Sequence, residues 1–138
     1  MATLHGWPDD MRKAARLAGV ELGGTKSIAV LADGDAILEQ RTVPTGTPQE
    51  TLSQLNTLLR AWDSAAELDA LGIASFGPVQ LDPASAEYAR MLDTPKPGWS
   101  NVPIGEALMA GLRCPWAIDT DVNAAALAEY SQGSAVGC

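Results

Sequence analysis

The segment Glu21-Leu22-Gly23-Gly24-Thr25-Lys26 combines residue types that could hold a phosphate group. Its two glycines leave a turn without side chains, so consecutive backbone N–H groups can point at a phosphate oxygen, and Gly24 can hold a positive φ. Thr25 adds a hydroxyl group, and Glu21 adds a carboxylate suited to the water shell of a magnesium ion. The spacing is neither that of a P-loop nor Gly-x-Gly-x-x-Gly, and glycine pairs are common in ordinary turns. A purely structural turn therefore stays open as the alternative.

A second segment that could do chemistry is Asp119-Thr120-Asp121-Val122-Asn123. We expect it where a strand ends and a helix begins, and ligands bind at the carboxyl ends of strands in open α/β sheets. Asp121 would then lie at the helix N-terminus, where the helix dipole favours the ionised carboxylate. Such a carboxylate can accept the proton of a substrate hydroxyl that attacks a phosphoryl group. The alternative is that Asp121 only caps the helix.

The elements that must position these two segments alternate along the chain. Apolar runs and turn residues predict strands, and apolar residues at helical spacing predict helices. The expected strands are 16–22, 27–32, 37–43, 68–74 and 116–119, and the expected helices are 48–62, 104–112 and 122–130. The first three strands form an antiparallel meander, and residues 79–101, rich in Pro and Gly, form a long functional loop. The order βββαβαβα predicts an α/β fold with one mixed sheet and flanking helices.

Local signals fix several ends of these elements. Asp33-Gly34-Asp35 predicts a hairpin turn, because Gly supplies the positive φ that a tight turn needs. The alternating pattern of residues 37–43 places Ile37, Glu39, Arg41 and Val43 on one face of an edge strand. Thr47, Pro48 and Glu50 predict a helix start with a capping box, and Leu52, Leu55, Leu58, Leu59 and Trp62 form its apolar face.

Composition limits the classes of function. The chain has 138 residues, 46% of them hydrophobic and 19% charged, which fits a single globular domain. Its formal net charge of −8 disfavours binding to nucleic acid and to an anionic membrane. Two cysteines without close spacing, Cys114 and Cys138, together with the absence of a signal peptide, favour a cytoplasmic protein. Residues 1–15 have little pattern and are expected to form a flexible leader before the domain, residues 16–138.

In combination, these motifs and elements resemble the ribonuclease-H-like ATPase half, of the actin/hexokinase type, that sugar kinases share with actin. More specifically, the chain resembles the ROK family of sugar kinases and repressors, and its fructokinase branch in particular. The resemblance covers residues 19–133 nearly without a gap. It rests on four stretches in the expected order, namely 19–26, 70–79, 94–101 and 120–127.

The resemblance implies roles for individual residues. Asp121 would be the catalytic base that takes the proton from the sugar hydroxyl. Gly23, Gly24 and Thr25 would approach the phosphates of ATP with Lys26 nearby, and Glu21 would face Mg²⁺. Gly77, Thr120 and Asp121 would contact the sugar, and Thr120 stands where members that act on glucose usually have Asn, which argues against glucose. The resemblance to the fructokinase branch favours fructose. Lys96 and Trp99 would lie at the rim of the substrate cleft, where Trp99 is expected to serve in packing.

Family members continue for more than another domain beyond the stretch that this chain matches. We therefore expect this chain to be the N-terminal half of a kinase, inactive alone and prone to form homo-oligomers through apolar surface that the C-terminal lobe would cover. That lobe would hold the adenosine site and a zinc site, so zinc is expected only there. The alternative function is a non-catalytic or regulatory ROK-type domain, either a pseudokinase or a relative of the repressors.

Overall fold

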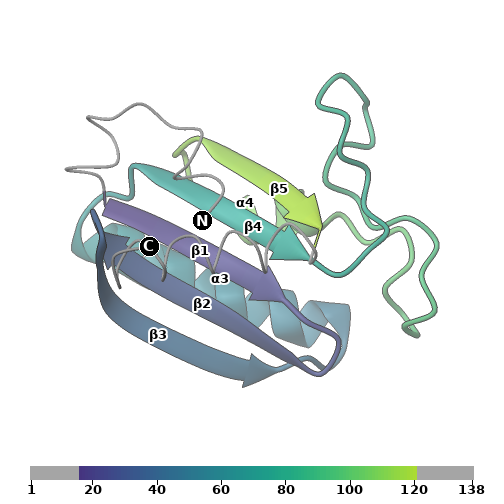
Figure 1. The fold of residues 1–138 in the computed structure, drawn as a ribbon, viewed down its shortest axis with the longest axis horizontal. Coiled ribbons are helices and arrows are strands. Elements are labelled where there is room, and N and C mark those ends of the chain that lie inside the picture. Colours follow the sequence, from purple (N-terminus) through teal and green to yellow (C-terminus); the bar gives the residue numbers. More distant parts are fainter. Residues whose placement is uncertain (1–15, 121–138) are drawn as a thin grey trace.

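The computed structural model describes residues 16–120, and Figure 1 shows the elements within that range. In chain order they are β1 (Arg16–Leu22), β2 (Lys26–Asp33), β3 (Ala36–Pro44), α3 (Pro48–Ala65), β4 (Ala70–Ser75), α4 (Ile104–Met109) and β5 (Trp116–Thr120). The predicted leader 1–15, the predicted helix 122–130 and the candidate base Asp121 lie outside the described residues.

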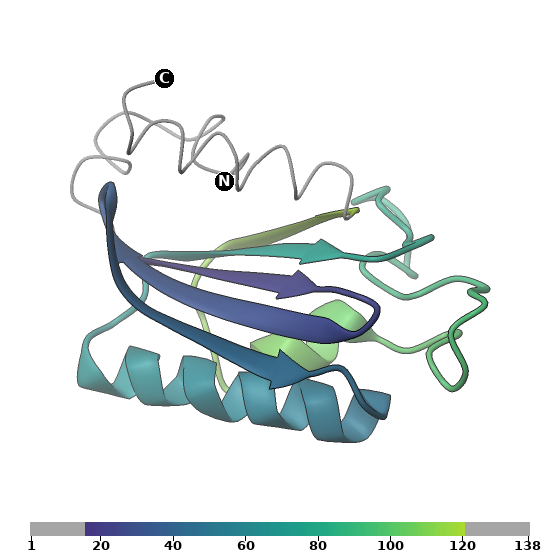
Figure 2. The same ribbon diagram turned by 60° about the horizontal axis from the view of Figure 1, so that its bottom comes forward.

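The described strands form one mixed sheet in the order β3-β2-β1-β4-β5. β1, β2 and β3 pair antiparallel, which confirms the predicted meander, whereas β4 pairs parallel with both β1 and β5. Both described helices lie on the same face of the sheet, as the turned view of Figure 2 shows. β4 is buried along its whole length, as expected for an interior strand. The predicted α/β class with a mixed sheet and flanking helices is thereby confirmed.

The β2–β3 hairpin matches its sequence signal, since Gly34 has a φ of +60° in the tight turn. β3 is the outermost strand at one side of the sheet, as predicted. The regular alternation expected along it is interrupted, because the pairing passes from Ile37 directly to Glu39 and leaves Leu38 without a partner position on β2. Ile37 and Leu38 are 50% and 53% exposed on this outer strand.

Helix α3 begins as its sequence predicts and packs through one apolar face. The Glu50 backbone N–H donates to the Thr47 hydroxyl at 3.2 Å, and that hydroxyl donates to the Glu50 carboxylate at 2.9 Å. The Glu50 side chain therefore bonds the hydroxyl of the cap, whereas a capping box would take it to the backbone N–H of the cap. The predicted apolar face is buried except for Leu58, which is only half-buried: Leu52, Leu55, Leu59 and Trp62.

Several predicted boundaries differ from the structure, and two of them have reasons visible in the backbone. β4 begins at Ala70 and not at residue 68, because the Leu68 N–H donates to the Asp63 carboxylate at 2.9 Å and the strand ladder starts later. Helix α4 ends at Met109 and not at residue 112, because Gly111 has a φ of +80° that no helix accommodates. β5 extends one residue further than predicted, to Thr120.

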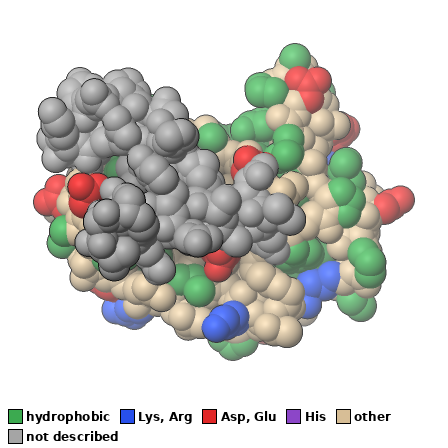
Figure 3. Space-filling model, viewed as in Figure 1, with side chains coloured by type: hydrophobic (Ala, Val, Ile, Leu, Met, Phe, Trp, Pro, Cys, Tyr) green, Lys and Arg blue, Asp and Glu red, His purple; other side chains and the backbone are tan. Residues whose placement is uncertain are grey.

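The predicted long loop spans residues 76–103 between β4 and α4 and projects beyond the sheet at the right of Figure 1. Within it, isolated antiparallel bridges pair Val79 with Met91 and Arg90 with Pro103. Met91 and Trp99 are fully buried and anchor the loop. Figure 3 shows hydrophobic side chains along its projecting part, where Leu81 is 36% exposed. Among the described helices, none is long and apolar enough to cross a membrane.

Candidate functional site

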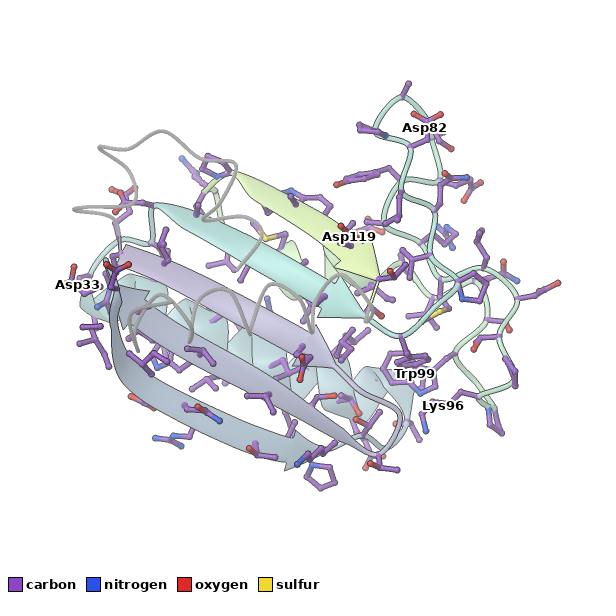
Figure 4. All side chains as sticks on the ribbon, in the orientation of Figure 1. Asp33, Asp82, Lys96, Trp99 and Asp119 are labelled. Carbon is purple, nitrogen blue, oxygen red and sulfur yellow. The ribbon has the colours of Figure 1, made fainter. Side chains whose placement is uncertain are left out.

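The candidate site lies at the edge of the sheet where three parallel strands end side by side. In the pairing register, Leu22 at the end of β1 stands opposite Ser75 at the end of β4, and Ser75 stands opposite Thr120 at the end of β5. The residues that follow these ends, the Gly23–Thr25 turn and Phe76-Gly77, therefore emerge next to one another. This edge is where α/β sheets bind ligands. Figure 4 shows Asp119, Trp99 and Lys96 at this edge and Asp33 at the opposite edge.

The glycine turn is short, exposed and braced from one side. The Gly23 N–H donates to the Lys26 carbonyl at 3.1 Å, and the Thr25 carbonyl accepts from the Thr45 N–H at 3.0 Å. Gly24, Thr25 and Lys26 are exposed, as a turn that contacts a ligand must be. The positive φ expected at Gly24 is wrong: positive φ occurs at other described glycines, and neither glycine of this turn has it.

The two glycines of the turn meet different surroundings. A Cβ atom added at Gly23 would lie 2.5 Å from the Lys26 carbonyl oxygen, so the hairpin itself requires glycine there. A Cβ added at Gly24 would meet nothing within 4 Å. Packing inside the described protein therefore explains Gly23 and leaves Gly24 free for close approach by a ligand.

Hydroxyl groups brace this turn in a way that the sequence interpretation missed. The Ser27 and Thr45 hydroxyls are 2.7 Å apart and join the start of β2 to the segment before α3. Ser27 is fully buried at the second position of β2. A small polar residue in a strand of otherwise apolar buried positions is the signal that could have identified this contact.

Glu21 lies one residue before the end of β1 and is half-buried. It has no ion-pair partner among the described residues, and these contain no group of three or more His, Cys, Asp and Glu side chains that could hold a metal. A single carboxylate beside an exposed glycine turn nevertheless fits Mg²⁺, which commonly takes one or two carboxylates and completes its shell with water and substrate phosphates.

Gly77 and Thr120 approach each other at the ends of β4 and β5. A Cβ added at Gly77 would lie 3.4 Å from the Val79 backbone nitrogen and 3.7 Å from the Thr120 Cγ2 atom. Asp119 accepts a hydrogen bond from the Thr120 backbone N–H at 2.8 Å. Gly77 and Thr120, to which the family resemblance assigns contacts with a sugar, are thus brought together at one edge.

Trp99 serves in packing, as predicted. Its side chain is fully buried, its indole N–H donates to the Gly46 carbonyl at 3.2 Å, and its ring meets the Phe76 ring edge-on at 5.2 Å between centroids. It therefore fastens the long loop to the segment before α3 and to the end of β4. Lys96, three residues earlier, is half-buried.

Tyr88 is a further contact that sequence reasoning did not identify. Its hydroxyl accepts a hydrogen bond from the Ile118 backbone N–H of β5 at 3.4 Å, and its ring stacks at a tilt on Trp116, with centroids 5.4 Å apart. The projecting part of the long loop is thereby tied to the strand that carries Asp119 and Thr120. A tyrosine in a loop of no clear pattern gives no signal of such a contact.

Comparison with protein families and with named proteins finds the ROK family and several sugar kinases. The sequence model of the ROK family matches residues 17–138. The fructokinase of Zymomonas mobilis is 42% identical over 121 residues, which cover 86% of this chain and 40% of the relative. The fructokinase of Streptococcus mutans is 35% identical, with 80% and 37% covered, and the glucokinase of Streptomyces coelicolor is 31% identical, with 86% and 37% covered. The chain spans about two fifths of the length of these relatives.

Solved structures with the same arrangement include sugar kinases and a regulator. A ROK family glucokinase from Streptomyces griseus, in complex with glucose and AMPPNP, superposes with a TM-score of 0.67 at 27% identity, covering 86% of this chain and 37% of that one. A ROK family transcriptional regulator superposes with a TM-score of 0.63 at 21% identity, covering 85% and 31%. At 21% identity, the similarity to the transcriptional regulator shows a shared fold and nothing about function. The fold is therefore that of the ROK sugar kinases, of the actin/hexokinase type.

Proposed function

This chain belongs to the ROK family, and we propose that residues 16–138 form the N-terminal, ATPase-type domain of an ATP-dependent hexose kinase. The observation that carries the proposal is the register Leu22–Ser75–Thr120, which brings the exposed glycine turn, Gly77 and the end of β5 to one edge of the sheet. Phosphoryl transfer needs this convergence, because it depends on positioning the phosphate and the accepting hydroxyl together.

The proposed reaction transfers the γ-phosphoryl group of ATP to a sugar hydroxyl. The Asp121 carboxylate takes the hydroxyl proton, the sugar oxygen bonds to the γ-phosphorus, and the bond from that phosphorus to the β-phosphate oxygen breaks, releasing ADP. The backbone at Gly23 and Gly24 and the hydroxyl of Thr25 hold phosphate oxygens, with the ammonium group of Lys26 nearby. Gly77 and Thr120 contact the sugar.

Glu21 is the residue that would hold Mg²⁺, and the ion when bound neutralises charge on the phosphate oxygens. In this proposal zinc belongs to the part of the longer relatives that this chain does not match.

We place the protein in the cytoplasm, where ATP and a sugar would be available to it. We also propose a homo-oligomer, since Ile37 and Leu38 expose apolar surface on the outer strand β3, and sedimentation velocity measures this directly.

Fructose is the proposed sugar. The fructokinases of Zymomonas mobilis and Streptococcus mutans are 42% and 35% identical to this chain, whereas the glucokinase of Streptomyces coelicolor is 31% identical. Thr120 in place of an amide side chain changes one hydrogen bond available to the sugar, which agrees with a preference other than glucose. Comparing kcat/KM for fructose, glucose and mannose tests this choice.

Asp121→Asn in the longest product of the gene tests the function. The amide cannot accept the hydroxyl proton, so turnover with fructose is expected to fall on the order of 10²–10⁴-fold while ATP binding persists. Asp35→Asn makes the same chemical change at an exposed turn on the opposite edge and serves as the matched control. Near-normal turnover in Asp121→Asn would leave helix capping as its role. Sugar binding without turnover in the unmodified protein would instead favour a regulatory domain.

A further inference from the structure

The segment Thr94–Asn101 of the long loop is held in one backbone conformation around Lys96. Pro95 and Pro97 fix φ on both sides of this residue. The Lys96 carbonyl accepts from the Trp99 N–H at 3.3 Å, and the Ser100 hydroxyl accepts from the Thr94 N–H at 3.1 Å, which closes the turn. Little backbone freedom is left for Lys96 to lose when it binds a ligand.

This segment is joined to the glycine turn by a short chain of contacts. Trp99 donates to the Gly46 carbonyl at 3.2 Å, and Thr45, the preceding residue, donates its N–H to the Thr25 carbonyl at 3.0 Å. In Figure 4, Trp99 and Lys96 lie next to the turn that joins β1 and β2. Lys96 is therefore at the same edge as the proposed phosphate-binding turn.

Lys96 differs from the other cations of the described residues. Four arginines donate to oxygen acceptors: Arg16, Arg41, Arg60 and Arg90. No such partner is present within residues 16–120 for Lys26, Lys96 or Arg113, and of these three only Lys96 is half-buried. The Lys96 side chain is therefore partly packed against the protein, and no described carboxylate engages its ammonium group, which leaves that group able to pair with an anion.

The helix end nearby does not supply an alternative anion site. In the first turn of α3 the Glu50 N–H bonds the Thr47 hydroxyl, and Pro48 has no N–H to offer. The Glu50 carboxylate is engaged by the same hydroxyl. The ammonium group of Lys96 is thus a positively charged group on this side of the edge that remains available to an anion.

We propose that Lys96 binds the phosphate group that is transferred, through its ammonium group and the terminal phosphate oxygens. This inference rests on the proposed kinase function and adds a residue to it from the loop side of the edge. A fixed cation at these oxygens stabilises the negative charge that they carry as the bond to the sugar oxygen forms and the bond to ADP breaks. Two compounds could present this phosphate group to Lys96: ATP, through its γ-phosphate, and the phosphorylated sugar product.

Kinetics of the longest product of the gene test the role of the charge. Lys96→Met is expected to lower kcat/KM for ATP on the order of 10²-fold, and Lys96→Arg is expected to recover part of that loss, because it keeps a cation at the position. Arg113→Met is the matched control. It removes an exposed cation that has no partner among the described residues, and it should leave kcat/KM for ATP unchanged. Equal kinetics in Lys96→Met and the unmodified protein, with Asp121→Asn inactive, would overturn the role of Lys96 and leave the kinase function standing.

Chemical labelling tests the binding without relying on turnover. The labelling uses the longest product of the gene, in which residues 1–138 contain three lysines, Lys13, Lys26 and Lys96, so acetylation by acetic anhydride can be assigned to each of them by mass spectrometry. Protection of Lys96 by a non-hydrolysable ATP analogue with Mg²⁺ identifies the nucleotide as the source of the phosphate. Protection by fructose 6-phosphate or fructose 1-phosphate identifies the product, and fructose alone should not protect. No protection by any phosphate compound overturns the proposal, even where the unmodified protein shows no kinase activity.

Discussion

Gly23 and Gly24 are neighbours in sequence but differ in why they are glycine. The hairpin excludes any side chain at Gly23, where a Cβ would come within 2.5 Å of the Lys26 carbonyl oxygen, whereas nothing in the described protein lies within 4 Å of a Cβ at Gly24. Gly24 has no positive φ, so neither packing nor backbone conformation within the described residues calls for glycine at this position. In the proposed function, close approach of a phosphate group supplies the reason.

The first prediction separates these two positions by alanine substitution. Gly23→Ala should lower the free energy of unfolding by about 1–3 kcal/mol, because the turn must open to admit the methyl group. Gly24→Ala should change it by less than about 0.5 kcal/mol and should raise the KM for ATP in the longest product of the gene. Thermal unfolding and steady-state kinetics measure the two effects. An unchanged KM in a normally folded Gly24→Ala protein would mean that phosphate does not approach this turn closely.

The second prediction concerns the thiol of Cys114, which precedes β5. Burial raises its pKa, and the carboxylates of Asp63, Asp69 and Glu67 raise it further. The thiolate is the form that reacts, so alkylation of Cys114 by iodoacetamide should be slow at neutral pH and should continue to rise above the ordinary thiol pKa of about 8.5. Mass spectrometry of the Cys114 peptide across a pH series gives the midpoint, with the chain unfolded in urea as the comparison.

The raised pKa of Cys114 also makes the free energy of unfolding depend on pH. The folded state holds the proton of Cys114 more tightly than the unfolded state, so the contribution to stability is complete below the ordinary pKa. It is lost as the pH rises through the raised pKa of the folded protein. Equal alkylation midpoints in the folded and unfolded chain would contradict the prediction.

At the scale of elements, one buried amide joins the two described helices. The Asn56 side-chain N–H groups donate to the Leu108 and Ala110 carbonyls, both at 2.8 Å, and its oxygen accepts from Arg60 at 2.9 Å. The carbonyls belong to the end of α4, where the helix leaves them without partners of its own. Asn56 therefore satisfies the end of α4 from the middle of α3.

The third prediction follows from this contact. Asn56→Ala should lower the free energy of unfolding by about 1–3 kcal/mol, because it leaves the buried Leu108 carbonyl and the partly buried Ala110 carbonyl without their donor. Gln54→Ala, an exposed substitution on the same helix, should change it by less than about 0.5 kcal/mol. Urea unfolding of both variants measures the difference. Two equal free energies would mean that water replaces the amide at the end of α4.

Local chemistry explains which elements the sequence predicts well. The hairpin at Gly34, the start of α3 at Thr47 and the interior strand β4 all depend on residues within a few positions, and each is confirmed. The wrong start of β4 and the path of the projecting loop depend on individual side-chain contacts. Leu68 stays out of β4 because its N–H bonds Asp63 at the end of α3, and the projecting loop is fixed by Tyr88 and Met91 against other elements. Such contacts have no period or turn signal in the sequence.

At the scale of the whole molecule, the order of the strands in the sheet brings the described residues of the candidate site together. Gly23–Lys26, Gly77 and Thr120 are separated by more than forty residues at each step, and the parallel pairing of β1, β4 and β5 brings them to one edge. The sequence pattern indicated that the glycine turn could bind phosphate, and the family resemblance assigned roles to the individual residues. The convergence itself could be expected only from the rule that parallel strands end together. The bracing of the turn by Ser27 and Thr45 could not be expected, because it joins two strand ends across the meander.

The last prediction is that this 138-residue chain by itself folds but phosphorylates no fructose. Its described core joins α3, α4 and the sheet, which is enough for an independent domain. The described site residues come from one edge of one sheet, whereas phosphoryl transfer depends on groups placed on both sides of the reacting phosphate. The chain also spans only about two fifths of the length of its fructokinase relatives. Circular dichroism should show a cooperative α/β domain, and a coupled assay should show no ADP above background with fructose and Mg-ATP. The full-length Zymomonas mobilis fructokinase is the positive control, and fructose phosphate formed by this chain alone would show that its site is complete without a second lobe.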